Sequence, residues 1–218
     1  MAEAWYRKHP EVLDEVRRRV FEIQPNLKFI DTVTGVLFKG TFLIQEGGRL
    51  YEEFEVEVGL SSKSAVSIPV VREVGGRIPH MADLHHVNPD GTLCVVLPDE
   101  YWYCFPDGLH IAEYISGPLR SHLSGQALVL RGEPWPQRDW AHGVEGQLAF
   151  YCEVLGTNDR QAAARLMLML ATGKVKGHRE CPCGSGRIVR ECHQEGIWKA
   201  SVRIPREVVM RRAKGLQR

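Results

Sequence analysis

The apolar positions along the chain follow two different periods. In residues 3–24 they recur at helical spacing, which predicts an amphipathic helix near the start. The residues that carry this pattern are Val12, Leu13, Val16, Val20 and Ile23. Residues 36–44 are rich in β-formers, and residues 53–60 alternate between acidic and apolar residues. This combination predicts an antiparallel hairpin with one face toward water, followed by a third strand at 65–74.

The pattern changes after the predicted strands. Residues 75–106 have no regular period and are rich in Gly, Pro, His, Asn and Asp. Long irregular stretches in compact domains are usually functional, so candidate chemistry is expected here. Helical spacing returns at 108–124, 144–155 and 159–172. A boundary is expected near 173–177, where lysines and glycines precede a cysteine-rich segment.

Composition and charge narrow the class of protein. Among the 218 residues, 44% are hydrophobic and 25% are charged, values of a globular chain that exclude a disordered or fibrous one. Lys and Arg total 28 against 27 Asp and Glu, so no global basic field indicates a nucleic-acid partner. The N-terminus lacks the apolar stretch of a secretory signal, and the apolar run 162–171 is too short to cross a bilayer. We expect a soluble, cytoplasmic protein that does not engage membranes.

Three of the six cysteines lie close together near the C-terminus. Cys181, Cys183, Cys192 and His193 supply three thiols and an imidazole within thirteen residues. In a reducing compartment such a cluster indicates a metal rather than disulfides, and a closed Cys₃His set is typical of structural zinc. The alternative is free thiols beside a chance histidine. Cys104 and Cys152 are interpreted as packing residues.

The cysteine-rich segment resembles a known zinc motif. The run Cys-Pro-Cys-Gly-Ser-Gly at 181–186 and the pair Cys192-His193 match the SEC-C motif, which is appended to many bacterial proteins. The resemblance covers about thirteen residues. It implies structural zinc binding and a role in protein contact, without catalysis.

A second set of reactive residue types lies in the irregular stretch. His85, His86 and Asn88 precede Cys94, and the intervening Asn-Pro-Asp-Gly is strong turn chemistry. A loop that folds back would bring these side chains near the thiol, where polar donors lower a thiol pKa or stabilise a developing oxyanion. The alternative is a buried structural cysteine flanked by surface histidines.

The order of the predicted elements, together with the run 91–94, resembles the ubiquitin-conjugating enzymes over roughly residues 3–145. Gly-Thr-Leu-Cys at 91–94 is similar to the motif around the family's acceptor cysteine. The resemblance implies an α+β fold of the UBC type: an antiparallel meander sheet with an N-terminal helix and C-terminal helices, here followed by a small zinc knuckle. It implies three regions: a UBC-like domain at 1–145, a helical extension at 146–175, and a zinc motif with a basic tail at 176–218.

The resemblance also assigns roles. It makes Cys94 the acceptor of a thioester. The family's His-Pro-Asn motif aligns with Leu84, His85 and His86, so His86 stands where the family has its asparagine and would have to act in its place. Asn88 lies two residues later and would substitute only in a rearranged loop.

The closest resemblance is to bacterial members of the CBASS antiviral type, which are encoded beside cGAS-like nucleotide synthases. The run Trp-Ala-His-Gly at 140–143 suits that group. The implied partner is the C-terminal tail of the synthase, which would form a thioester with Cys94 and then pass to an amine. Three alternatives remain: a non-catalytic UBC-fold adaptor that grips a partner's tail, a Cys–His hydrolase, and a zinc-dependent nucleic-acid adaptor.

Overall fold

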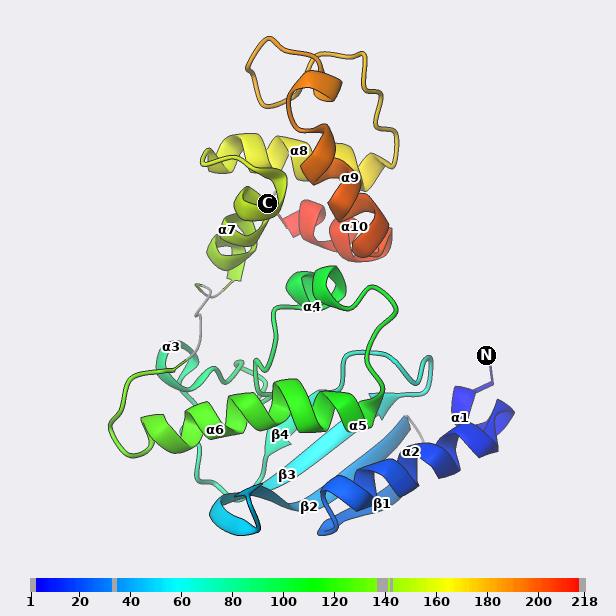
Figure 1. Ribbon diagram of the computed structural model, residues 1–218, viewed down its shortest axis with the longest axis vertical. Helices are drawn as coiled ribbons and strands as arrows, with labels where there is room; N and C mark the ends of the chain where they lie inside the picture. Colours follow the sequence, from blue (N-terminus) through cyan, green and yellow to red (C-terminus); the bar gives the residue numbers. More distant parts are fainter. Residues whose placement is uncertain (1–2, 33–34, 137–140, 142, 216–218) are drawn as a thin grey trace. The chain divides into compact units, whose positions relative to one another are not determined.

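The computed structural model describes residues 3–32, 35–136, 141 and 143–215 (Figure 1). The chain divides into two compact units, which are described separately. The sheet unit comprises Met1–Val96 and Gly108–Arg138, and the helical unit comprises Leu97–Asp107 and Asp139–Arg218. Neither unit is continuous in sequence. No helix in the described part of the chain is both long and apolar enough to cross a membrane.

The sheet unit is built on an open antiparallel sheet of four strands in the order β1-β2-β3-β4. The strands are β1 (Leu27–Thr32), β2 (Gly35–Glu46), β3 (Arg49–Ser61) and β4 (Val70–Glu73). The expected hairpin corresponds to β2 and β3, and β4 occupies the end of the stretch expected at 65–74. The α+β class and the antiparallel sheet are therefore confirmed. Strand β1 was not expected, because its apolar residues do not alternate and Ile30 is exposed.

One face of the sheet is buried and the other is exposed to solvent, as expected. Alternate residues of β2 and β3, such as Phe38, Phe42 and Val56, are buried. On the opposite face Lys39 pairs with Glu57 across the two strands at 2.8 Å. Antiparallel sheets with this alternation bury only the apolar face.

Helices α2 (Pro10–Ile23) and α6 (Arg120–Val129) pack against the sheet, and α5 (Ile111–Tyr114) packs against α2. The helix expected at 3–24 is split into α1 (Trp5–Lys8) and α2. Proline lacks a backbone N–H and therefore starts a helix more easily than it continues one, and Pro10 starts α2. The helix expected at 108–124 runs as α5, a π-helical segment (Ile115–Leu119) and α6.

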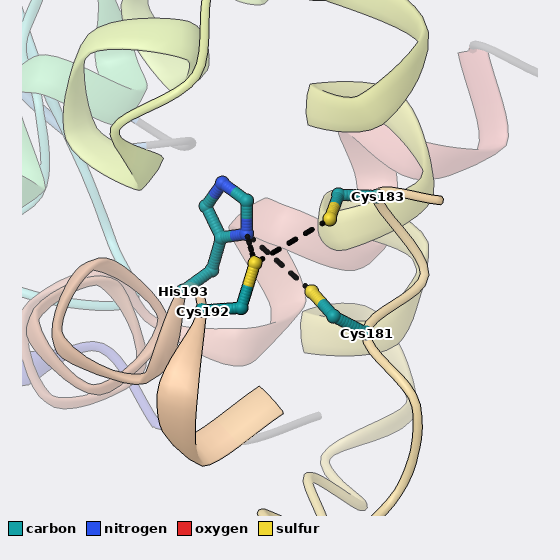
Figure 2. A group of neighbouring side chains, drawn as sticks. All are labelled: Cys181, Cys183, Cys192 and His193. Atoms are coloured by element: carbon teal, nitrogen blue, oxygen red, sulfur yellow. Dashed lines mark hydrogen bonds between the residues drawn. The ribbon is translucent and has the colours of Figure 1, made fainter. Parts of the chain in front are cut away.

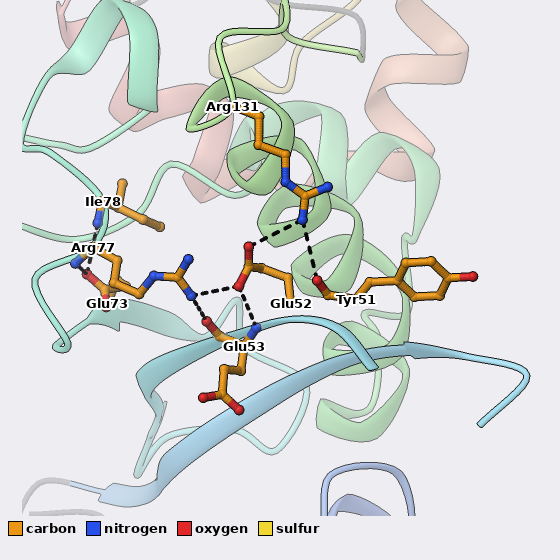
Figure 3. A network of polar contacts seen from close by, with 7 residues as sticks. All are labelled: Tyr51, Glu52, Glu53, Glu73, Arg77, Ile78 and Arg131. Atoms are coloured by element: carbon orange, nitrogen blue, oxygen red, sulfur yellow. Dashed lines mark hydrogen bonds and ion pairs between the residues drawn. The ribbon is translucent and has the colours of Figure 1, made fainter. Parts of the chain in front are cut away.

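The stretch 75–106 is more ordered than its composition indicates. It contains the short helices α3 (Ala82–His85) and α4 (Pro98–Cys104). The carboxylate of Glu73, at the end of β4, accepts hydrogen bonds from the backbone N–H groups of Gly75 (2.8 Å), Arg77 (3.0 Å) and Ile78 (3.2 Å). Figure 3 shows the contacts with Arg77 and Ile78. Arg77 in turn pairs with Glu52 of β3 at 2.8 Å. These contacts pin the start of the stretch to the sheet.

The helical unit consists of α4, α7 (Gly143–Leu155), α8 (Arg160–Thr172), a 3₁₀ turn (Val189–Glu191), α9 (Gln194–Arg203) and α10 (Arg206–Gly215). Helices α7 and α8 lie where helical spacing predicts them. Asp159 caps the start of α8 by accepting a hydrogen bond from the backbone N–H of Gln161 at 2.8 Å. At the other end Gly173 adopts φ 66°, a conformation that favours glycine and ends the helix.

The C-terminal region differs from the expected basic tail. Residues 194–203 and 206–215 form α9 and α10, and Ile197, Ala200 and Val209 are buried in the core of the helical unit. The arginines of α10 mask its apolar side in the sequence, and in α9 the exposed Trp198 and Val202 interrupt the apolar pattern. The segment 97–107, which the sequence places in the first domain, packs in the helical unit.

Candidate functional site

Cys94 lies at the end of a narrow hairpin-like loop. Its turn is the Asn-Pro-Asp-Gly run, in which the N–H of Gly91 donates to the carbonyl of Asn88 at 2.8 Å. Gly91 has φ 77°, a conformation that favours glycine. The carboxylate of Asp90 accepts from the N–H (3.0 Å) and the hydroxyl (2.6 Å) of Thr92. The turn predicted from the sequence is therefore confirmed.

The loop is fastened on both sides of Cys94. The N–H of Leu93 donates to the carbonyl of Val71 in the edge strand β4 at 2.8 Å, and the N–H of Cys94 donates to the carbonyl of His86 at 2.7 Å. The loop thus folds back as expected and brings His86 to the backbone of Cys94. Cys94 is only partly buried, so part of the residue is accessible to solvent.

The two histidines before the turn are buried. His85 is 5% exposed and His86 is 7% exposed, which contradicts the alternative of surface histidines. His86 caps the end of α3 with φ 48°, and no other described residue except glycine has a positive φ. This conformation costs roughly 1 kcal/mol for an ordinary side chain, so its surroundings must hold it in place.

A buried glutamine on α6 provides that support. The side-chain amide of Gln126 donates to the backbone carbonyl of His85 at 2.5 Å and lies 3.2 Å from Nε2 of His122. Its carbonyl oxygen lies 3.1 Å from Nδ1 of His85. All polar atoms of this amide therefore have partners, as burial requires. Gln126 clamps the end of α3, the element that leads directly into His86.

Trp135 closes this buried cluster. Its ring centroid lies 4.4 Å from that of His86 and 5.3 Å from that of His122. The indole fits because Gly125 has no side chain: a Cβ there would lie 2.9 Å from the Trp135 ring. Burial, followed by the neighbouring His86, lowers the pKa of His122 to about 3, so this ring is neutral near pH 7.

Asn88 is the remaining residue predicted for this site, and its side chain binds within the turn. The side-chain amide nitrogen of Asn88 donates to the hydroxyl of Thr92 at 2.9 Å, so its amide stabilises the turn. His122, Gln126 and Trp135 were not predicted as part of the site. His122 lies in the helix predicted at 108–124, and Gln126 follows one turn later in the part of α6 that the prediction missed. Trp140 and His142 lie outside the described residues.

The second candidate site is the Cys/His cluster of the helical unit. The ligand atoms of Cys181, Cys183, Cys192 and His193 all lie within 4.8 Å of one another, and this set can hold a metal ion (Figure 2). The sulfurs of Cys183 and Cys192 lie 3.6 Å apart, and Nδ1 of His193 lies 3.4 Å from the sulfur of Cys181. A tetrahedral zinc ion requires edges of about 3.8 Å between sulfurs and roughly 3.6 Å between sulfur and nitrogen. The separations in the cluster extend from 3.1 Å, between the sulfur of Cys192 and Nδ1 of His193, to at most 4.8 Å, so they bracket these values and the side chains present can hold a metal ion.

The fold around the cluster is fixed by the backbone. The N–H of Cys181 donates to the carbonyl of Arg187 at 2.8 Å, and the N–H of Gly184 donates to the carbonyl of Cys181 at 3.2 Å. Gly184 has φ 88°, as the tight turn between the ligands requires. Arg165 of α8 donates to the carbonyls of Pro182 at 2.6 Å and Cys183 at 3.0 Å.

The cysteines of this cluster differ in acidity. Cys181 is 1% exposed, and burial raises the pKa of its thiol to about 12. Burial also raises the pKa of Cys183, but hydrogen bonds with Ser185 and with the neighbouring thiols outweigh it and lower that pKa to about 7. A bound cation favours both thiolates, and metal binding would therefore offset the penalty at Cys181.

Comparisons with protein-family models, with curated proteins and with solved structures gave no match. The chemistry of the Cys94 loop and of the Cys/His cluster therefore carries the functional conclusion.

Proposed function

We propose that the chain is a bacterial ubiquitin-conjugating-enzyme-like transferase of the CBASS antiviral type. The observation that carries the proposal is the Cys94 loop: Cys94 is partly exposed, its N–H is bound by the carbonyl of His86, and the preceding Leu93 is bound to β4. The order of an N-terminal helix, four meandering strands, this loop and further helices supports a UBC-type arrangement.

The proposed reaction has two acyl-transfer steps. In the first, the thiolate of Cys94 attacks the carbonyl carbon of an activated C-terminal tail, and the leaving group departs as the new C–S bond forms. In the second, an amine attacks that thioester, an amide bond forms, and Cys94 leaves as a thiolate. The proton lost by the amine passes to solvent. The proposed donor is the C-terminal tail of a cGAS-like synthase, and the proposed location is the cytoplasm.

The proposed role of His86 is to order the loop and to stabilise the oxyanion that forms when the amine attacks. Its carbonyl fixes the N–H of Cys94, and its ring is packed against Trp135. His86 also supplies the carbonyl that binds the N–H of Cys94, which favours His86 over His85 for the direct role. Asn88 supports the turn.

Loading of Cys94 is tested with a short peptide prepared as its C-terminal thioester. We expect a mass increase equal to the peptide acyl group on Cys94 of the full chain, and a stable oxyester with Cys94→Ser. Cys104→Ser, which removes an exposed cysteine, is the matched control and should load normally. Absence of any adduct would refute the transferase and favour an adaptor. Release of the free carboxylate without transfer to an added amine would favour a hydrolase.

Substitution of His86 separates its proposed role from loading. We expect His86→Ala to slow transfer from Cys94 to an amine by about 100-fold, the usual effect of losing one oxyanion donor, while loading changes much less. His86→Asn is the matched variant, because asparagine tolerates a positive φ and also carries an amide donor. It should retain most of the transfer rate in single-turnover assays. Equal slowing of both steps by His86→Ala would contradict the assignment.

We further propose that the metal of the Cys/His cluster is zinc and that this segment is a zinc knuckle of the SEC-C type. Three thiolates and one imidazole form a closed tetrahedral set, the usual ligand type of structural zinc. The cluster rests on the core of the helical unit, in which Cys181 is itself a buried member. Its proposed role is stability and protein contact rather than catalysis.

A further inference from the structure

The chain passes from the sheet unit to the helical unit immediately after Cys94. Cys94 belongs to the sheet unit, which ends its first segment at Val96, and Leu97 begins the part that packs in the helical unit. Two residues therefore separate the thiol from a segment held by a different core. Whatever holds Leu97–Asp107 also limits how far the end of the Cys94 loop can move.

A buried ion pair holds this segment. Asp99, in the first turn of α4, is 0% exposed. Its carboxylate lies 2.9 Å from Nε of Arg212 on α10 and accepts a hydrogen bond from the hydroxyl of Tyr151 on α7 at 3.0 Å. Burial and then the adjacent Asp99 raise the pKa of Tyr151, so its hydroxyl remains a donor. A fully buried carboxylate needs such partners, and the three residues tie α4 to α7 and α10.

Further contacts join the same segment to the core beneath the metal ligands. Arg203 of α9 donates to the backbone carbonyl of Tyr103 at 2.9 Å, and its guanidinium lies 5.4 Å from the centre of the Tyr103 ring. Leu97 and Trp102 pack against the apolar cluster that includes Cys181 and Val189. The segment after Cys94 and the metal ligands thus share one core.

We propose that Asp99 is a positioning residue for Cys94 and that the metal site supports it. The metal stabilises the core of the helical unit, this core and Asp99 hold the segment at Leu97, and the two intervening residues transmit that restraint to Cys94. The inference rests on the proposed function only in taking Cys94 as the nucleophile. It assigns the helical unit a second role, namely to keep the end of the nucleophile loop in one conformation.

The test compares Asp99→Asn with Leu166→Ala in the full, metal-loaded chain. Asparagine has nearly the shape of aspartate and can keep the Tyr151 contact, whereas Leu166→Ala weakens the same core from the buried side of α8. We expect about tenfold faster hydrogen exchange at residues 93–97 in Asp99→Asn, because the restrained end opens locally. Alkylation of Cys94 by iodoacetamide, followed by peptide mass spectrometry, should rise about threefold for the same reason.

Loading of Cys94 from the peptide thioester should fall in Asp99→Asn although the thiol becomes more accessible. The decrease should appear in the rate at saturating thioester rather than in the concentration needed for half-saturation. Global unfolding would give the same pattern, but it would also expose the amides of β3 at 54–58, which should stay protected in Asp99→Asn. Arg212→Lys keeps the charge, so its loading rate, hydrogen exchange and alkylation should lie between those of wild type and Asp99→Asn.

Metal removal provides a second, independent experiment. Chelation of the wild-type chain with EDTA should also accelerate exchange at 93–97, while amides of β3 at 54–58 stay protected. Exchange at 93–97 in Asp99→Asn no faster than in wild type, or unchanged exchange at 93–97 after chelation, would overturn the inference. The exchange and alkylation measurements do not depend on acyl transfer. Absence of loading in the wild type would therefore refute the proposed function alone.

Discussion

Loss of the metal is expected to unfold the helical unit. The free energy of metal binding to small Cys/His sites also stabilises the fold. Removal of the metal should therefore lower the free energy of unfolding of the helical unit by about 5 kcal/mol or more. The expected cause is local: without a cation, the buried Cys181 thiol stays protonated because its pKa is raised to about 12, and the ligand set loses the centre that joins it. The metal-loaded chain should contain one zinc ion per molecule by elemental analysis. Chelation should abolish cooperative thermal unfolding of α7–α10.

Two variants make this prediction specific. Cys181→Ser should lose the metal and reproduce the effect of chelation. Cys152→Ser is the matched control, because Cys152 is a partly buried cysteine that packs against the same core without belonging to the ligand set. It should retain the metal and unfold within about 1 kcal/mol of wild type. A wild-type chain that contains no zinc, or that unfolds identically with and without EDTA, would contradict the assignment.

Mild acid is expected to destabilise the sheet unit through His122. In the folded state its pKa is about 3, whereas an unfolded histidine has a pKa of about 6.5. Between these values the unfolded chain takes up a proton that the folded chain does not. The contribution to stability is therefore complete above about pH 6.5 and is lost as the pH falls toward 3. The free energy of unfolding should drop by about 2 kcal/mol between pH 7 and pH 5.

The measurement should follow the sheet unit alone, since acid also protonates the metal ligands. Urea unfolding monitored by amide NMR signals of β2 and β3 meets this need. His122→Gln replaces the ring with a side chain that is neutral at every pH, so its slope over this range should largely disappear. His9→Gln, at an exposed histidine, is the control and should keep the wild-type slope. A slope in His122→Gln equal to that of wild type would show that another group binds the proton.

Whether the hydrophobic pattern predicted an element correctly depended on how that element is buried. Strands β2 and β3 were predictable because they bury one face and expose the other, which gives a clean alternation. Helix α8 was predictable from its helical spacing. Strand β1 was missed because it lies at the edge of the sheet and buries little, so hydrogen bonds to β2 define it more than its side chains do. Helix α10 was missed because arginines dominate its exposed face, and α9 was missed because its exposed Trp198 and Val202 obscure the helical spacing.

The two candidate sites also differ in how fully the sequence predicts them. The Cys/His cluster was predicted from spacing alone, because its ligands lie within thirteen residues and a short turn brings them together. The buried cluster around His86 was not predicted in full. Gln126 lies forty-one positions from His85 in the chain, and only the packing of α6 against α3 brings them into contact. No local pattern encodes such a pairing.

The sequence by itself determined the α+β class, the antiparallel hairpin, the turn before Cys94 and the four candidate metal ligands. Each depends on residues close together in the chain, where spacing and turn chemistry dictate geometry. The tertiary structure alone decided that His85 and His86 are buried, that Gln126 clamps His85, and that Asp99 pairs with Arg212 across 113 positions. Burial of a polar side chain is set by which distant partner satisfies it, and that partner is chosen by the packing of whole helices.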